Sequence, residues 1–289
     1  MTRWTLAAVS FLAITVVAHA DVMILPPGID RIVLSDAIVV GRVIAIEPQD
    51  VEIPLTPDGN LKFRFRIAVV NVSEPIVGKK DVKTLRVGFV PADEKRNPIG
   101  FGKYPELNFR LELGKQGLMF LRKHAGTGIL HGRLYHDFVA HDSEPKEKPQ
   151  GGMPLSSFSE ELKKSRQIAR LMEKPVVGLQ AKDGLDRYLS AVALTVRYRT
   201  PTVAKAKTEL ISSDESKLIF AALLERDWTI VAPTPTPWQC FQMLGITERE
   251  GWKSPTKIAN ANDLRAAVRT WHEKHGEYRI SRFLPESAP

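Results

Sequence analysis

The sequence predicts an α+β protein in which a small β-barrel or sandwich precedes a helical domain. Apolar and alternating segments, typical of strands, fall in the first half. Capping residues followed by apolar residues at helical spacing fall in the second half. A charged segment rich in Pro and Gly separates the two. We therefore expect a signal peptide at 1–20, a β domain at 21–142, a linker at 143–156 and a helical domain at 157–289.

Composition agrees with a folded globular protein. The chain has 289 residues, of which 43% are hydrophobic and 26% are charged. These values exclude wholesale disorder and a polytopic membrane protein, and a single cysteine excludes a disulfide scaffold. Cys240 lies in an apolar segment and is expected to be a small buried hydrophobe. The net charge of +8 includes local clusters such as Arg197 with Arg199, and favours contact with anionic surfaces.

The first twenty residues are predicted to be a secretory signal peptide that is cleaved after Ala20. Arg3 gives a short positive start, an apolar run follows, and Ala18-His19-Ala20 fits the small-residue rule for cleavage. The apolar run is shorter than the roughly 20 residues that a membrane-spanning helix needs. We therefore expect an exported protein, periplasmic or secreted, without a transmembrane segment after cleavage.

Six strands are expected in the β domain, after a short amphipathic turn at 29–35. The first is nearly all apolar and β-branched, which indicates a strand buried on both faces. Gly41 in its middle indicates a bulge. In the second strand Phe63 and Phe65 face one side, while Lys62, Arg64 and Arg66 face the other. The expected strands span 37–47, 61–72, 83–90, 109–113, 117–122 and 134–140.

Five helices are expected in the second half. Each begins at a residue whose side chain can cap the first turn, and Ser212 with Glu215 is expected to form a capping box. In the second helix Leu185, Leu189 and Val192 are expected to face inward. The last helix is expected to end at Gly276 and to be followed by an extended tail at 277–284. The expected capping residues are Ser157, Asp183, Ser212, Thr236 and Asn262, and Gly245 is expected to end the fourth helix.

Three segments of the β domain resemble exported OB-fold proteins related to the netrin and tissue-inhibitor-of-metalloproteinase module. They are the aspartate, apolar run, glycine and basic residue of 35–43, the strand and glycine turn of 70–78, and the apolar strand of 113–121. The resemblance covers about 100 residues and implies a five-stranded OB-like β-barrel. It does not imply protease inhibition, because the cysteines of the inhibitory members are missing. As a whole the chain resembles uncharacterised exported bacterial proteins.

The strongest candidates for metal ligands are histidines near the end of the β domain, accompanied by two aspartates. Histidine and carboxylate together suit zinc or iron. If 134–140 is a strand, however, His136 and His141 point to opposite faces. His124 and His131 flank a glycine turn and could approach each other. The full set is His124, His131, His136, His141, Asp137 and Asp142.

Other catalytic patterns are incomplete. His272 and His275 are three residues apart, whereas the metalloprotease helix needs four. Ser254 and Lys257 match the S-x-x-K pair, but the accompanying motifs of penicillin-binding enzymes do not occur. The nucleotide-binding glycine motifs, the G-x-S-x-G elbow and C-x-x-C are also missing from the sequence. We therefore assign no catalytic, cofactor-binding or metal-binding residue and expect no cofactor.

These observations favour a non-enzymatic binding protein. The expected partner is another exported protein or an anionic envelope polymer, and nucleic acid is not expected. The loops 48–60 and 91–107 are predicted to form the binding rim, with Lys62, Arg64 and Arg66 aiding approach. The alternatives are a metal-dependent hydrolase centred on the segment from His124 to Asp142 and a structural protein of the cell envelope.

Overall fold

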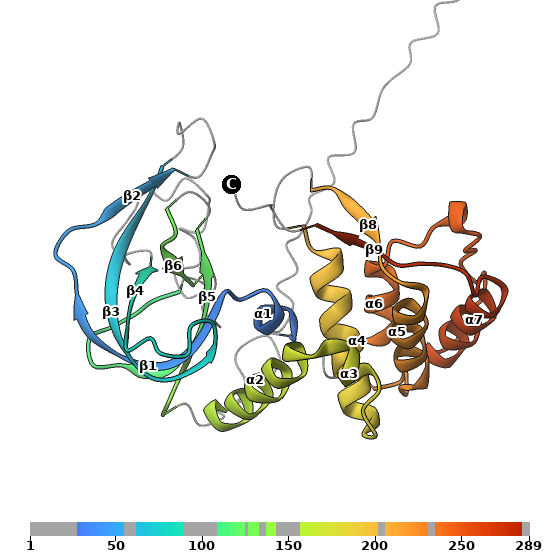
Figure 1. The fold of residues 1–289 in the computed structure, drawn as a ribbon, viewed down its shortest axis with the longest axis horizontal. Coiled ribbons are helices and arrows are strands. Elements are labelled where there is room, and N and C mark those ends of the chain that lie inside the picture. The colour runs from blue at the N-terminus through green and yellow to red at the C-terminus, as the bar shows by residue number, and fades with distance from the viewer. Residues whose placement is uncertain are drawn as a thin grey trace, which may run out of the picture.

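The chain forms a β-barrel and a helical region that lie side by side. The computed structural model describes residues 28–54, 62–89, 109–124, 127–132, 137–142, 157–201, 206–230 and 235–284. Figure 1 shows the barrel on the left and the helices on the right, with α1 between them. The predicted signal peptide, the linker 143–156 and the loop 91–107 lie outside the described residues.

Five strands close the barrel. Around the ring they follow the order β1 (Ala37–Ile46), β3 (Lys62–Val77), β4 (Thr84–Phe89), β6 (Leu130–His131) and β5 (Gln116–Lys123). Strands β4 and β6 are parallel, and β1 and β5 pair to close the ring. The predicted α+β class with an N-terminal OB-like barrel is thus confirmed. Two further strands, β2 (Val51–Pro54) and β7 (Phe138–Ala140), pair with β3 and β5.

Gly41 marks a bulge in β1, as predicted. The pairing register between β1 and β3 shifts between Val40 and Gly41. A Cβ at position 41 would lie 2.6 Å from Cγ1 of Val70 and 2.9 Å from the carbonyl oxygen of Asn71. Only glycine therefore allows the two strands to approach this closely where the barrel curves.

Strands β1 and β5 are apolar on both faces because each face has a different partner. Val39 and Met119 point into the barrel interior. Ile38 and Phe120, their neighbours in sequence, point outward and belong to the core of the helical region. The prediction that the first strand is buried on both faces is thus confirmed, and one continuous core joins the barrel to the helices.

Two strand predictions fail. Residues 109–113 do not form a strand, although Phe109 and Leu111 are buried in the barrel interior and Leu113 is exposed. The apolar residues of 109–113 alternate with polar ones because the segment buries every second side chain. The segment itself is irregular and does not pair with a neighbouring strand. The strand expected at 134–140 is reduced to the three residues of β7, and residues 133–136 lie outside the described part. The short strands β2 and β6 were not predicted.

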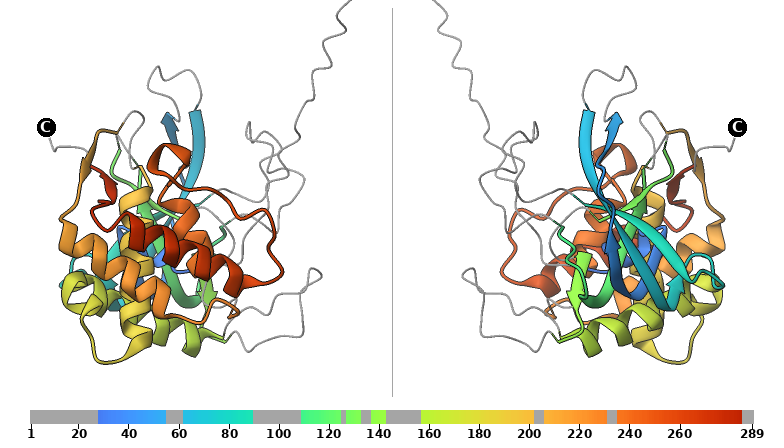
Figure 2. Two further views of the ribbon diagram at one scale, coloured as in Figure 1. Left: turned by 90° about the vertical axis from the view of Figure 1, so that its right-hand side faces the viewer. Right: turned by 90° about the vertical axis from the view of Figure 1, so that its left-hand side faces the viewer.

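The helical region begins with a short helix against the barrel. A second helix, α2, ends just before Pro175, as predicted. The long helix α4 contacts α1, α2, α3, α5 and α6 and is the centre of the region. Figure 2 shows the barrel in front in one view and the helices in front in the other. The elements are α1 (Asp30–Val33), α2 (Phe158–Glu173), α3 (Pro175–Leu179), α4 (Gly184–Arg199), β8 (Thr208–Leu210), α5 (Ser213–Glu225), α6 (Pro237–Met243), α7 (Ala261–Lys274) and β9 (Ser281–Phe283).

Most of the predicted caps are confirmed. The side chains of Ser157, Asp183, Ser212 and Thr236 each accept a hydrogen bond from the backbone N–H three residues later. The prediction for Asn262 is wrong, because Asn260 caps α7. Asp263 decides between the two asparagines, since its carboxylate accepts from the N–H of Asn260 and closes a capping box.

Two further predictions for the helical region need correction. Leu185 was expected to face inward but is exposed, because the buried part of α4 begins only at Tyr188. Helix α7 has its C-cap at His275, one residue before Gly276. The expected extended tail contains β9, which pairs with β8 in a two-stranded sheet that was not predicted.

Candidate functional site

A cavity of about 830 Å³ lies at the junction of the barrel and the helices. Its size lies in the range usual for small-ligand sites, roughly 300–1,000 Å³. Six separate elements contribute residues to it. They are α1, the end of β3, the end of α2, the start of α3, the end of α4, and β9.

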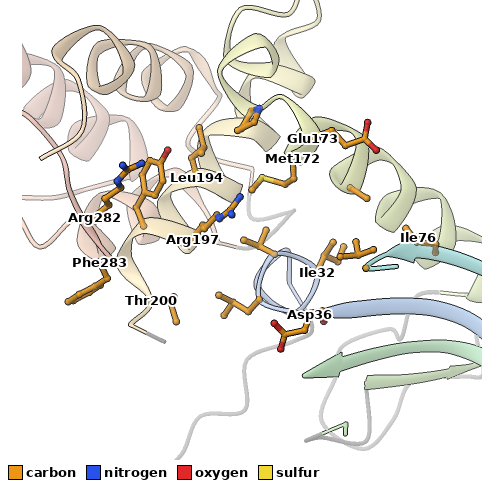
Figure 3. A pocket seen from close by; sticks show the side chains of 18 of the residues that line it. Ile32, Asp36, Ile76, Met172, Glu173, Leu194, Arg197, Thr200, Arg282 and Phe283 are labelled. Atoms are coloured by element: carbon orange, nitrogen blue, oxygen red, sulfur yellow. The ribbon is translucent and has the colours of Figure 1, made fainter. Parts of the chain in front are cut away.

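The walls of the cavity are mostly apolar. Ile32 projects from α1, Ile76 from β3, Met172 from α2 and Leu194 from α4, as Figure 3 shows. Ile32 and Leu194 are almost completely buried, whereas Ile76 and Met172 are partly exposed. An apolar ligand group in this cavity would therefore cover surface that now meets water, which is favourable.

Three cations line the same cavity, and they differ in their partners. Lys80 lies 3.4 Å from a carboxylate oxygen of Glu173. Arg282 forms an ion pair with Glu209 across the β8–β9 sheet. Arg197, in the last turn of α4, is exposed and makes no hydrogen bond or ion pair with any residue that the structure describes. Arg197 is thus the cation of the cavity that has no intramolecular partner among those residues.

Tyr198 lines the cavity, and its hydroxyl is hydrogen-bonded within the protein. Its hydroxyl donates to Oε1 of Glu215 at 2.5 Å. Burial, together with this hydrogen bond, raises the pKa of Tyr198 to about 12. The hydrogen bond also explains why Glu215 does not close the capping box expected with Ser212, whose hydroxyl accepts the Glu215 N–H alone.

A buried charged cluster fixes the inner side of the junction. Arg31 of α1 pairs with Glu161 of α2, and both side chains are almost inaccessible to solvent. Lys164 lies 3.7 Å from the same carboxylate, and its burial lowers the pKa of its ammonium group. The Arg31 guanidinium also lies 4.1 Å from the ring centre of Phe120 on β5. The cluster therefore ties α1, whose neighbouring residues line the cavity, to both α2 and the barrel.

The described members of the candidate histidine set do not assemble into one site. The rings of His124 and His131 do approach each other, with centroids 6.1 Å apart. His141 instead packs on Phe158 at the start of α2, at 4.7 Å. His136 lies outside the described residues. Within the described ranges, no three His, Cys, Asp or Glu side chains are placed to hold a metal ion.

The basic stripe predicted on β3 is paired with carboxylates. Arg64 and Arg66 each lie 3.0 Å from an oxygen of Asp50. Lys62 lies 3.5 Å from Glu52 on β2. The two carboxylates thus offset two of the three positive charges of the stripe. Of the predicted rim, 91–107 and 55–60 lie outside the described residues.

The structure also describes the other candidates from the sequence analysis, which are Cys240, the pair His272 and His275, and the pair Ser254 and Lys257. Cys240 is completely buried, as predicted, and this burial raises the pKa of its thiol. His272 packs on Phe220, and His275 stacks on Trp271. Ser254 and Lys257 are exposed, and no hydrogen bond joins them in the described structure.

Sequence reasoning missed the cavity. Arg197 and Arg199 stood out only as a basic cluster, and the fold gives them different roles. Arg199 donates to the carbonyl oxygens of Met243 and Ser281, which holds β9 against α4. No signal along the chain could distinguish the two arginines, because their surroundings come from elements distant in sequence.

Comparisons with known proteins do not identify this chain. No protein-family model matches it, and no curated protein matches its sequence. In the described part of the chain, no helix is both long and apolar enough to span a bilayer. The argument about function therefore depends on the geometry of the site.

Proposed function

We propose that this protein is an exported, non-enzymatic binding protein whose ligand occupies the cavity between the barrel and the helices. The observation that supports the proposal best is the cavity itself, which combines mostly apolar walls with the unpartnered Arg197 at its edge. A few convergent polar groups in an apolar hollow are typical of ligand sites. Export rests on the predicted signal peptide at 1–20, and kinship with netrin-related OB proteins rests on the segments 35–43, 70–78 and 113–121.

The proposal differs from the sequence-based expectation in the place of binding. The rim loops and the stripe on β3 were expected to meet a partner. Asp50 and Glu52 pair with the cations of that stripe, whereas the junction contains a hollow lined by an arginine without such a partner among the described residues. We therefore move the candidate site to the junction. A second exported protein or an anionic polymer of the envelope would then present one group to the cavity.

A neutral apolar dye, N-phenyl-1-naphthylamine, tests the proposal. We expect saturable fluorescence enhancement with one dye per chain. Ala169 lines the cavity from α2, so Ala169→Trp should fill it and weaken dye binding at least tenfold. The matched control is Ala266→Trp, on the exposed surface of α7. No saturable binding, or equal binding by both variants, would refute the proposal.

The metal-dependent hydrolase remains a second candidate because His124 and His131 lie near each other. Nδ1 of His124 lies 3.2 Å from the hydroxyl oxygen of Thr127, and Nδ1 of His131 lies 3.3 Å from the carbonyl oxygen of Gly132. Elemental analysis of tag-free protein tests this candidate. One metal per chain that is lost in His131→Ala would favour it over the binding protein.

A further inference from the structure

The charges around the cavity indicate which class of ligand it would accept. Its two carboxylates are both engaged. Oδ2 of Asp36 accepts the backbone N–H of Lys123 at 2.6 Å, and Glu173 lies beside Lys80. Arg197 has no such partner among the described residues. The backbone N–H that Asp36 accepts is neutral, so this carboxylate keeps its negative charge. The described lining still has more cations than carboxylates, because Lys80, Arg197 and Arg282 stand against Asp36 and Glu173.

Arg197 is also well placed to meet a ligand. Figure 3 shows its side chain extending from α4 into the space that faces Ile32 of α1, below Met172 of α2. A guanidinium offers parallel N–H donors that match a carboxylate or phosphate group, and such bonds are stronger than those between neutral groups. The apolar side chains lie within the same hollow, so one ligand could use both features.

We propose that the cavity binds a single-headed anionic amphiphile, with its acidic group on Arg197 and its hydrocarbon chain against Ile32, Met172 and Leu194. This inference rests on the proposed binding function and adds the ligand class. A carboxylate and a phosphate monoester share the required chemistry. A cationic amphiphile does not, because its head would face Arg197 and the neighbouring Arg282.

Four twelve-carbon probes that differ only in the head group test the ligand class: dodecanoate, dodecyl phosphate, dodecanol and dodecylamine. Affinities are measured below micelle-forming concentrations, by displacement of the neutral dye. We expect either anion to bind about tenfold or more tightly than dodecanol, and dodecylamine to bind most weakly. The ratio of the two anion affinities identifies the preferred head group.

Arg197→Gln separates this inference from the proposed function. Arg197 is exposed, so the variant should fold, and it should lose the preference for the two anions over dodecanol. Arg269→Gln, an exposed arginine of α7 outside the cavity, is the matched control and should keep the preference. Arg197 could instead act only through a favourable interaction with the dipole of α4. Arg197→Gln would then lower the melting temperature and leave the head-group preference unchanged, which would contradict the inference.

Three outcomes are distinguishable. Anion preference that depends on Arg197 supports the inference. Saturable, Ala169→Trp-sensitive binding of dodecanol and the anions with equal affinity would overturn the ligand class and leave the binding function standing. Binding of no probe, including the neutral dye, would overturn both.

Discussion

The barrel interior and the junction with the helices both bury apolar residues, but they differ in their buried polar and charged side chains. In the described strands β1 to β7, no buried side chain is polar or charged. At the junction, Arg31, Glu161 and Ser165 are buried beside the apolar residues, and a cavity lies next to them. The described barrel strands therefore bury apolar side chains, whereas the junction combines packing with charge and space. This difference indicates where a ligand would bind.

The buried ion pair gives the largest expected effect. Glu161→Gln removes the charge that faces Arg31 and Lys164, and should lower the free energy of unfolding by about 3–5 kcal/mol, because buried cations are then left without it. Urea denaturation measures the change, and Glu273→Gln on the exposed face of α7 is the control. Arg31→Met combined with Glu161→Met should recover most of the loss. A double variant as unstable as Glu161→Gln would show that packing, and not charge, matters there.

Two adjacent residues of β5 allow the barrel interior and the junction to be compared directly. Met119 faces the barrel interior and Phe120 faces the junction. Replacing either with alanine should cost about 2–5 kcal/mol of stability. Dye binding by the folded protein should weaken only in Phe120→Ala, since Phe120 supports the Arg31 side chain of α1. Equal dye affinity in the two variants would mean that the junction does not shape the cavity.

A surface ion pair gives the smallest expected effect. Arg166 of α2 donates two hydrogen bonds to Glu74 of β3 and holds the pKa of that carboxyl below its usual value. The contribution of the pair is present above the pKa of glutamate in the unfolded chain, and is lost as the pH falls through the lowered value. Arg166→Gln should cost less than about 1 kcal/mol at pH 7.

Stability at low pH tests whether the Arg166–Glu74 ion pair causes this difference. Well below the lowered pKa of Glu74, the variant and the natural chain should have the same stability, as measured by urea denaturation at each pH. A difference that stays constant down to strongly acidic pH would assign the effect to packing of the Arg166 side chain.

Much of the fold could be predicted from local sequence. The caps at Ser157 and Thr236 act within one helical turn, so their residues suffice to place α2 and α6. Gly41 indicated the bulge because a single crowded position requires it. By contrast, β6 has two residues, and its pairing with β4 is decided by the closed ring and not by its own composition.

The candidate site could not be predicted in the same way. Ile32 and Leu194 are apolar residues at ordinary core positions, and nothing in the sequence shows that they border a hollow. The two arginines near the end of α4 became distinguishable only after β9 was placed against Arg199. The candidate histidines are close in sequence, but His141 turns toward α2, where it packs on Phe158.

The most direct test of the proposed site is hydrogen–deuterium exchange of the full chain with and without dodecanoate. Ligand in the cavity should slow backbone exchange in the segments that line it, at 32–36, 172–175 and 194–200. Exchange near His124 and His131 should not change. Slowing confined to those histidines, or no change anywhere at saturating dodecanoate, would contradict the account.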